Sequence, residues 1–368
     1  MKCKLICPIC GTEYSTKEPV WRCDCGSYLD LGFKPKFEKN LLSNEKTLWR
    51  YSQVLPVDKK FAVTFNEGYT PLILADFWGM NVLCKLDFLL PTGSFKDRGA
   101  ALIIAKCKEL GINEIVEDSS GNSACAVSAY CVRAGIKANI YMPAGNSTGK
   151  AVQAKAYGST IHLVQGNRED CANAALEGAK KSYYAAHAWN PYFLQGTKTV
   201  IYEIVEQLNW NAPDYIFVPV GSGTLLLGTY IGLRELIDSS IIDKMPQLIA
   251  VQSEQCSPLK DYVEGTQSCT PDKDQSIAEG IAIRKPVRLM QIVNAVIESK
   301  GDFVTVDDTT IIEAFKESAH QGIYIEPTSA AAIAALKQYV GKIPPRSKVV
   351  VLLTGSGLKT TATIEKLL

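Results

Sequence analysis

Short apolar runs rich in β-branched residues alternate with longer, helix-like stretches over most of this chain. The apolar runs are residues 114–120, 138–144, 160–166, 215–221, 247–253 and 348–355. The helix-like stretches include residues 123–135, 148–158, 168–184 and 197–209. Strands that alternate with helices in this way predict parallel sheets covered by helices. A chain of 368 residues can form more than one domain, so we expect an α/β protein with more than one part.

The composition argues against several classes of partner. The formal net charge is +1, which gives no general attraction to nucleic acid or to an anionic membrane. The longest apolar candidate, residues 212–228, is interrupted by Pro219 and by glycines, and the N-terminus has too short an apolar stretch for a signal peptide. Most cysteines after residue 25 lie in apolar contexts, as free thiols do. We therefore expect a cytoplasmic protein that binds neither nucleic acid nor membrane.

Four cysteines near the N-terminus have the spacing of a metal site. Cys7 and Cys10 are separated by two residues, as in a zinc knuckle, whereas Cys23 and Cys25 are one residue closer than that template. Four thiolates would complete a closed, tetrahedral and structural Zn²⁺ site, in which Cys3 could replace one ligand. The alternative is a set of thiols without metal on a flexible leader. The sequence favours a zinc ribbon.

Three of the predicted strands end in loops of small residues. These loops are residues 118–123, 219–224 and 352–359. In open α/β sheets the ligand crevice lies beyond the carboxyl ends of the strands, where backbone N–H groups and helix N-termini favour anions. Together with the glycine-flanked lysine of "TGSFKDRG", the loops predict a crevice for an anionic ligand.

The common nucleotide motifs do not account for these loops. In "GSGTLLLG" the third glycine falls too late for a dinucleotide fingerprint, and "GNSTGKA" is one residue short of a P-loop and lacks Ser or Thr after Lys150. The chain has only three histidines, which argues against a catalytic triad that contains histidine. His162 alternates with apolar residues in a predicted strand, which favours a packed imidazole.

At this point the motifs resemble a known family. "PTGSFKDRG" (91–99) resembles the Schiff-base lysine motif of fold-type II pyridoxal phosphate (PLP) enzymes, particularly threonine synthases, and "NEGYTPL" (66–72) is similar to their "GEGxTPL". "SSGNSACAVSAYCVRAG" resembles the asparagine loop and its helix, and "VGSGT" the phosphate loop. "GIYIEPTSAAAIAAL" followed by "LTGSGLK" resembles the C-terminal signature. The resemblance runs in order from about residue 60 to residue 360.

The resemblance implies a fold and a division into domains. The fold is that of the tryptophan synthase β-like, fold-type II PLP enzymes, with two parallel-sheet α/β domains after a zinc-ribbon-like extension. We expect the extension at residues 1–32 and the catalytic region at residues 33–368, with the smaller subdomain at roughly 92–190.

The resemblance also implies roles for single residues. Lys96 would bind PLP as a Schiff base and then act as the base at Cα; the alternative is a surface ion pair with Asp97. Asn122 would bind the 3′ oxygen of the cofactor, or else cap its helix. Thr354 would meet the pyridine nitrogen. The cofactor's phosphate would be held by the loop of Gly221, Ser222, Gly223 and Thr224.

The predicted substrate contacts follow the same resemblance. The substrate carboxylate would meet Ser119, Ser120 and Ser123. A substrate phosphate would be bound by Lys150 with the hydroxyls of Ser147 and Thr148, although a solvated Lys150 is the alternative. Asp97 and Arg98 would anchor their loop, and Glu326 would either cap the next helix or lie near the active site.

The implied activity is that of a PLP-dependent carbon–oxygen lyase. The first expectation is a threonine synthase of amino-acid biosynthesis, which converts O-phospho-L-homoserine and water to L-threonine and phosphate. Ser222 and Thr224 depart from the usual glycine-rich phosphate loop, and the spacing of residues 142–158 is closer to that of serine/threonine dehydratases. The second expectation is therefore a dehydratase or β-replacement synthase that acts on a serine-like substrate. The third expectation is a non-enzymatic zinc-ribbon protein with a degenerate PLP domain. The partner is a small amino-acid substrate, and analogy suggests a homodimer.

Overall fold

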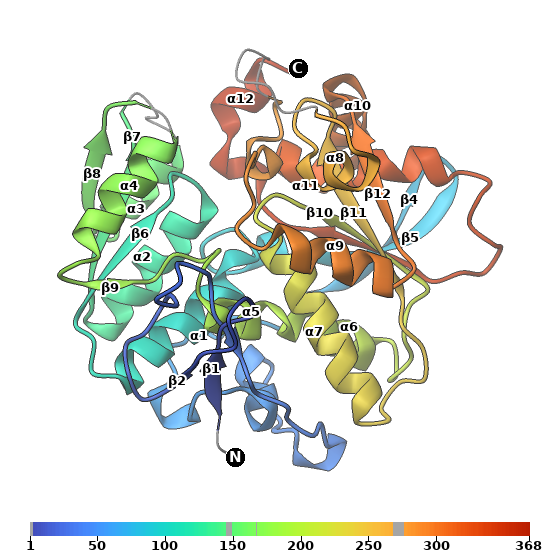
Figure 1. The fold of residues 1–368 in the computed structure, drawn as a ribbon. Coiled ribbons are helices and arrows are strands. Elements are labelled where there is room, and N and C mark those ends of the chain that lie inside the picture. Colours follow the sequence, from blue (N-terminus) through green and yellow to red (C-terminus); the bar gives the residue numbers. More distant parts are fainter. Residues whose placement is uncertain (1–2, 145–148, 167, 268–275) are drawn as a thin grey trace. The chain divides into compact units, whose positions relative to one another are not determined.

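The computed structural model describes residues 3–144, 149–166, 168–267 and 276–368, and the chain divides into two units (Figure 1). Unit 1 comprises Met1–Gly68 and Lys96–Thr199, and unit 2 comprises Tyr69–Phe95 and Val200–Leu368. In the part of the chain that the structure describes, no helix is long and apolar enough to cross a membrane.

Unit 1 is built on a four-stranded parallel sheet. Its strand order is β8-β7-β6-β9, and the strands are β6 (Glu114–Asp118), β7 (Lys137–Pro143), β8 (Thr160–Val164) and β9 (Tyr183–Tyr184). The helices of this unit are α1 (Lys96–Glu109), α2 (Asn122–Ala134), α3 (Gly149–Ala156), α4 (Arg168–Gly178) and α5 (Pro191–Thr197). β6 is buried along its middle, as expected for a parallel strand covered by helices.

Two glycines let α1 and α5 approach closely. A Cβ atom at Gly99 of α1 would lie 2.3 Å from the Phe193 ring, and one at Gly196 of α5 would lie 2.0 Å from the carbonyl oxygen of Arg98. Any side chain at either position would push the helices apart. This contact sets the ring of Phe193 beside the start of α1.

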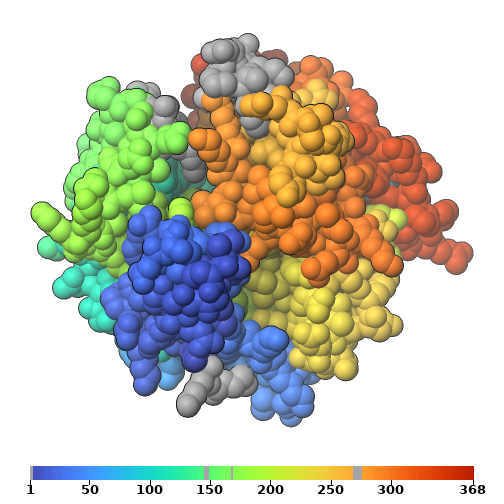
Figure 2. Space-filling model, viewed as in Figure 1, coloured from blue at the N-terminus to red at the C-terminus, as the bar shows by residue number. Residues whose placement is uncertain are grey.

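The N-terminal ribbon also belongs to unit 1. Its antiparallel strands β1 (Lys4–Ile6), β2 (Glu13–Ser15) and β3 (Asp30–Leu31) have the order β2-β1-β3, and the 3₁₀ turns Lys39–Leu41, Leu48–Val54 and Lys59–Phe61 follow them. The ribbon, blue in Figure 2, lies at the surface, and its Trp21 ring contacts Tyr184 and Trp189 at centroid distances of 4.6 and 5.7 Å. The ribbon is therefore packed against the segment between β9 and α5.

Unit 2 is built on a six-stranded sheet of order β12-β11-β10-β13-β5-β4. Its strands are β4 (Leu72–Phe77), β5 (Met80–Leu86), β10 (Tyr215–Pro219), β11 (Gln247–Ser253), β12 (Asp302–Val306) and β13 (Val349–Leu353). All neighbours are parallel except β4 and β5, which form an antiparallel hairpin. The hairpin turns at Trp78 and Gly79, both with positive φ.

The helices of unit 2 include one, α11, that is almost completely buried. They are α6 (Thr199–Gln207, whose first residue belongs to unit 1), α7 (Thr224–Asp238), α8 (Pro258–Glu264), α9 (Leu289–Glu298), α10 (Asp308–His320), α11 (Pro327–Leu336) and α12 (Thr361–Glu365), with 3₁₀ turns at Asp87–Leu89, Glu279–Ile281, Lys337–Tyr339 and Gly357–Lys359. The alanine-rich α11 is buried on almost every side and contacts β10, β11, β12 and β13. Small side chains allow this close packing of a helix on a sheet.

A buried polar network surrounds Thr70 of the "NEGYTPL" motif. The backbone N–H of Thr70 donates to Glu203 at 3.2 Å, and its hydroxyl donates to Asp87 at 2.7 Å. The fully buried Lys85 forms an ion pair with Glu203 at 2.8 Å, and Lys85 and Gln207 both donate to the carbonyl of Thr70. The motif thus has a structural role, which is to join the start of β4 to β5 and α6.

The predicted elements agree with the structure apart from one local correction. All six apolar runs contain strands (β6, β7, β8, β10, β11 and β13), and the parallel sheets are confirmed. The predicted helix 168–184 is wrong at its end, because α4 stops at Gly178 and Tyr183–Tyr184 pair with β6 as β9. The predicted domain limits stay predictions, and unit 1 joins residues 1–68 to 96–199 rather than separating a ribbon from a subdomain at 92–190.

Candidate active site

Lys96 is the first residue of α1. Its side chain is half-buried, and its Nζ lies 5.6 Å from the centre of the Phe193 ring. An aromatic face attracts a cation and shields it partly from water. The lysine therefore stands at a helix start, on a surface provided by the α1–α5 contact.

The residues beside Lys96 are held firmly. Asp97 and Arg98 are both fully buried, and the guanidinium of Arg98 donates to the Thr199 hydroxyl at 3.1 Å. Asp97 is therefore not at the surface, where the alternative of an ion pair with Lys96 placed it. On the other side, the N–H of Phe95 donates to the carbonyl of Thr354 at 2.9 Å within unit 2.

The asparagine loop joins β6 to α2. Gly121 occupies the cap position of α2, and Asn122 is the first residue inside the helix, so Asn122 is not the cap. Ser119 accepts the N–H of Gly121 at 3.2 Å, and Ser119, Ser120 and Asn122 are half-buried. These three side chains keep partial access to solvent at the carboxyl end of a strand.

Ser123 is placed differently from the expectation. It is 1% exposed, and its hydroxyl donates at 2.8 Å to the carboxylate of Glu117, which is itself fully buried in β6. A hydroxyl held inside unit 1 in this way is a poor ligand for a substrate carboxylate. The structure therefore gives no support to Ser123 as a substrate contact.

Glu117 and His187 are residues that sequence reasoning missed. His187 Nδ1 lies 2.9 Å from Glu117 Oε1, and the backbone N–H of His187 donates to Oε2 at 3.2 Å. The imidazole is 6% exposed and its ring lies 5.6 Å from that of Phe193. The available signal was an acidic residue, Glu117, directly after the apolar pair Ile115–Val116 in a strand predicted to be covered by helices.

Lys150 is buried rather than solvated. It is the second residue of α3 and is 6% exposed, while its carbonyl accepts a hydrogen bond from the Cys125 thiol at 3.3 Å. The alternative of a solvated helix residue is therefore wrong. Ser147 and Thr148, predicted beside it, lie outside the described residues.

The glycine loop of unit 2 joins β10 to α7. Gly223 caps α7 with a φ of +79°, and a Cβ there would lie 2.1 Å from Ile292 Cδ1. A Cβ at Gly221 would lie 2.5 Å from the carbonyl oxygen of Gly280. Side chains are thus excluded at both positions by neighbouring atoms, and at Gly223 also by the backbone.

Thr354 follows β13 and is held by Ser329 of α11. The two hydroxyl oxygens are 3.0 Å apart, and Ser329 Oγ accepts the N–H groups of Thr354 and Gly355 at 2.9 and 2.8 Å. Thr354 is buried. Ser329, in "EPTSAA", is a third residue that sequence reasoning missed.

Glu326 occupies the cap position of α11, but its side chain makes no cap hydrogen bond. The carboxylate is buried, and a Cβ at Gly355 would lie 2.1 Å from its Oε1. Of the two expected roles, side-chain capping is wrong. Glu326 packs against the residue that follows Thr354.

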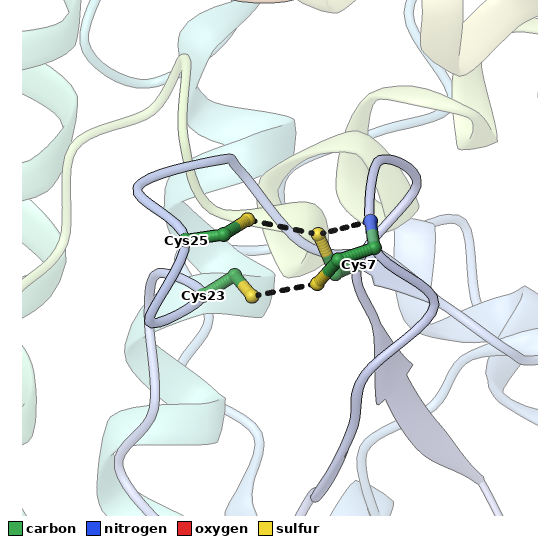
Figure 3. Close-up of side chains that lie close together, drawn as sticks. Cys7, Cys23 and Cys25 are labelled. Carbon is green, nitrogen blue, oxygen red and sulfur yellow. Dashed lines mark hydrogen bonds between the residues drawn. The ribbon is translucent and has the colours of Figure 1, made fainter.

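The four predicted metal ligands lie together in the ribbon. The sulfur atoms of Cys7, Cys10, Cys23 and Cys25 all lie within 4.8 Å of one another. Figure 3 shows Cys23 and Cys25 facing Cys7; the sulfurs of Cys7 and Cys25, and those of Cys10 and Cys23, are 3.5 Å apart. Zn–S bonds of about 2.3 Å in a tetrahedron place sulfurs about 3.8 Å apart, so these distances fit.

Neighbouring groups lower the pKa of one of these thiols and raise the pKa of another. The Thr12 hydroxyl lowers the pKa of Cys10 to about 6. The Ser27 N–H lowers the pKa of Cys25, but the thiols of Cys23 and Cys7 outweigh it and raise that pKa to about 12. Thiols that share protons in this way would lose those protons when a divalent cation binds.

Comparison of this sequence with known families identifies the family of the chain. A sequence model described as "Pyridoxal-phosphate dependent enzyme" matches residues 63–355. The chain belongs to this family. Curated relatives include the threonine synthase of Methanocaldococcus jannaschii, 34% identical and covering 96% of this chain and 92% of the relative, and that of Methanosarcina acetivorans, 35% identical with 98% and 93% covered.

Several solved structures have the same fold as this chain. A fungal L-serine ammonia-lyase from Rhizomucor miehei has a TM-score of 0.71 at 24% identity, covering 81% of this chain and 97% of its own. Maize serine racemase has a TM-score of 0.69 at 22% identity, covering 81% and 91%. The predicted fold-type II class is therefore confirmed, and the chain is a PLP-dependent lyase.

The residues present fit this cofactor. Within the described residues, the N–H groups of Gly221, Ser222 and Gly223 enter no backbone hydrogen bond, and they lie at the N-terminus of the 15-residue α7. Such N–H groups bind a phosphate without a basic side chain. The glycines keep side chains out of that loop, so its geometry fits a phosphate group.

Proposed function

We propose that this enzyme is a threonine synthase that converts O-phospho-L-homoserine and water to L-threonine and phosphate. The observation that carries the proposal is the match to curated threonine synthases over at least 92% of both chains. The solved structures, at less than 25% identity, support the fold alone. The homodimer and the cytoplasmic location stay proposals, and the second is supported by the free thiols of all the described cysteines.

The reaction requires two proton abstractions, at Cα and then at Cβ, before phosphate leaves from Cγ and water adds at Cβ. PLP, when bound, supplies the electron sink that stabilises negative charge at Cα. We assign both proton transfers to the amine of Lys96. Its half-buried position over Phe193 supports this, because an amine partly removed from water moves a proton more readily.

In unit 1 we assign Asn122 to the 3′ oxygen of the cofactor, and Ser119 and Ser120 to the substrate carboxylate. Their half-burial at the end of β6 and the N-terminus of α2 supports these roles. Ser123 is left out of the substrate site because its hydroxyl donates a hydrogen bond to Glu117.

In unit 2 we assign the loop Gly221–Thr224 to the cofactor's phosphate and the Thr354 hydroxyl to the pyridine nitrogen. Ser329 orients Thr354 through two contacts with it and a third with the N–H of Gly355, so the hydroxyl needs little reorganisation to bind. A neutral partner leaves the nitrogen largely unprotonated, which suits elimination and replacement chemistry.

Lys150 is the proposed ligand of the substrate phosphate. Its place in the first turn of α3 supports the role, since the N-terminus of a helix favours an anionic ligand. The test is turnover of phosphohomoserine by Lys150→Ala, with Lys155→Ala, an exposed lysine of the same helix, as the matched control. The KM should rise at least about tenfold in the first variant only, with the cofactor's absorbance unchanged.

The same assay tests the reaction itself. Threonine and phosphate should appear in equal amounts from phosphohomoserine. Formation of 2-oxobutyrate from threonine, or pyruvate from serine, with no phosphate released from phosphohomoserine, would replace the proposal by a dehydratase.

We also propose one Zn²⁺ per chain on Cys7, Cys10, Cys23 and Cys25. The hydroxyl of Tyr14, which donates to the Cys23 sulfur at 3.2 Å, supports a thiolate there. Metal analysis of protein prepared without oxygen should find about one zinc per chain in the wild type and in Cys3→Ser, but much less in Cys23→Ser. Equal zinc contents in all three proteins, or none in the wild type, would contradict the site.

A further inference from the structure

Glu117 is a fully buried carboxylate to which none of the roles above has been assigned. Three donors meet it inside unit 1: the Ser123 hydroxyl at 2.8 Å, the backbone N–H of His187 at 3.2 Å and the His187 ring nitrogen Nδ1 at 2.9 Å. A carboxylate accepts such bonds strongly when it is removed from water.

The two partners of Glu117 lie next to proposed active-site residues, one through the chain and the other through an aromatic ring. Ser123 is the neighbour of Asn122 in the first turn of α2. His187 lies against the ring of Phe193 at a centroid distance of 5.6 Å, and the same ring lies 5.6 Å from Lys96 Nζ. Glu117 is therefore the point at which the asparagine loop and the surface under Lys96 are joined.

Stability alone does not account for this arrangement. A buried pair of ionisable side chains is often no more stable than apolar residues of similar volume, whereas removal of one partner leaves a buried polar group without compensation. What a buried pair between two segments does provide is a fixed orientation of one segment relative to the other. Small errors in such orientation have large effects on rate.

We propose that Glu117 and His187 form a positioning pair that sets Asn122 and Lys96 in their working orientation. The inference rests on the proposed function only in taking Lys96 as the lysine that carries the cofactor. Glu117 acts through Ser123 on the asparagine loop, and His187 acts through Phe193 on the lysine. Neither residue needs to touch the substrate.

The test separates the hydrogen bond of His187 from its ring contact. His187→Phe keeps a ring against Phe193 but removes the donor to Glu117, whereas His187→Asn keeps a donor near the position of Nδ1 and loses the ring. The matched control is His162→Phe, because His162 also lies in unit 1, bonds a side chain (Asn139 at 2.9 Å) and stacks on an aromatic ring (Tyr141 at 4.4 Å).

Three quantities are measured on holoenzyme: the visible circular dichroism of the bound cofactor, the rate at which borohydride fixes it to Lys96, and kcat/KM. His187→Phe should change the dichroism, slow fixation and lower kcat/KM about 100-fold, and His187→Asn should lose about tenfold or less in kcat/KM. His162→Phe should match the wild type in all three.

The proposal is overturned if His187→Phe folds and matches the wild type in dichroism and fixation rate. If His187→Phe does not fold, Ser123→Ala decides, because it removes a single donor from Glu117. It should alter the dichroism and lower kcat/KM about tenfold, and no change would overturn the proposal. Dichroism and fixation are measured without substrate, so an error in the proposed substrate would leave them unaffected.

Discussion

The two units hold their candidate site residues by different means. In unit 1 the neighbours of Lys96 and Asn122 are ionisable and buried: Asp97, Arg98 and the Glu117–His187 pair. In unit 2 the phosphate loop and Thr354 are held by backbone N–H groups, glycines and the neutral hydroxyl of Ser329.

This difference predicts where each unit is vulnerable. Loss of one partner from a buried charged pair costs about 3–5 kcal/mol of folding free energy, whereas loss of a neutral hydrogen bond costs about 1 kcal/mol. Unit 1 should therefore be sensitive to changes of side chain. Unit 2 should be sensitive mainly where a new side chain would displace its backbone.

Lys96→Ala should have the largest effect, because it removes the side chain that unit 1 is proposed to position. We expect turnover to fall at least about 1,000-fold, since a base and a covalent attachment are both lost. In the wild type, borohydride reduction and peptide mapping should find the cofactor on Lys96. A label on Lys150 or Lys198 would contradict the assignment.

Gly223→Ala should have the next largest effect and acts on the backbone of unit 2. The new Cβ would lie 2.1 Å from Ile292 Cδ1 at a φ of +79°, so the loop must shift. We expect the affinity for PLP to fall about 100-fold, as measured by equilibrium titration of the apoenzyme. Gly265→Ala is the control, because Gly265 has a φ of +70° and nothing within 4 Å of the new Cβ. It should lose about 1 kcal/mol of stability and no PLP affinity. Equal losses of affinity in both variants would contradict the proposed phosphate loop.

Ser329→Ala should have the smallest effect, since only neutral contacts are lost. The N–H groups of Thr354 and Gly355 lose an acceptor, and we expect a loss of about 1–3 kcal/mol in the free energy of unfolding and about tenfold in kcat/KM. Ser318→Ala is the control, because this buried hydroxyl bonds only the Phe315 carbonyl of its own helix among the contacts described. A matching fall in kcat/KM for Ser318→Ala would mean that the loss at Ser329 is one of stability alone.

The sequence predicted the parallel strands and the position of each loop, because hydrophobic runs and glycines act locally. It missed the Glu117–His187 pair, whose members are 70 residues apart and meet only through the sheet. The burial of Ser123 and Lys150 also depends on which face of a helix is covered, and their short motifs do not specify that. Tyr183–Tyr184 form a strand only because β6 lies beside them.

The contact of Trp21 with Tyr184 and Trp189 has a consequence for shortened forms of the protein. A chain that begins at residue 33 would lack Trp21, and two aromatic rings flanking His187 would face water. Exposed aromatic surface of this kind promotes self-association. We therefore expect such a fragment to aggregate on concentration even while its cofactor remains bound, whether or not the ribbon carries a metal.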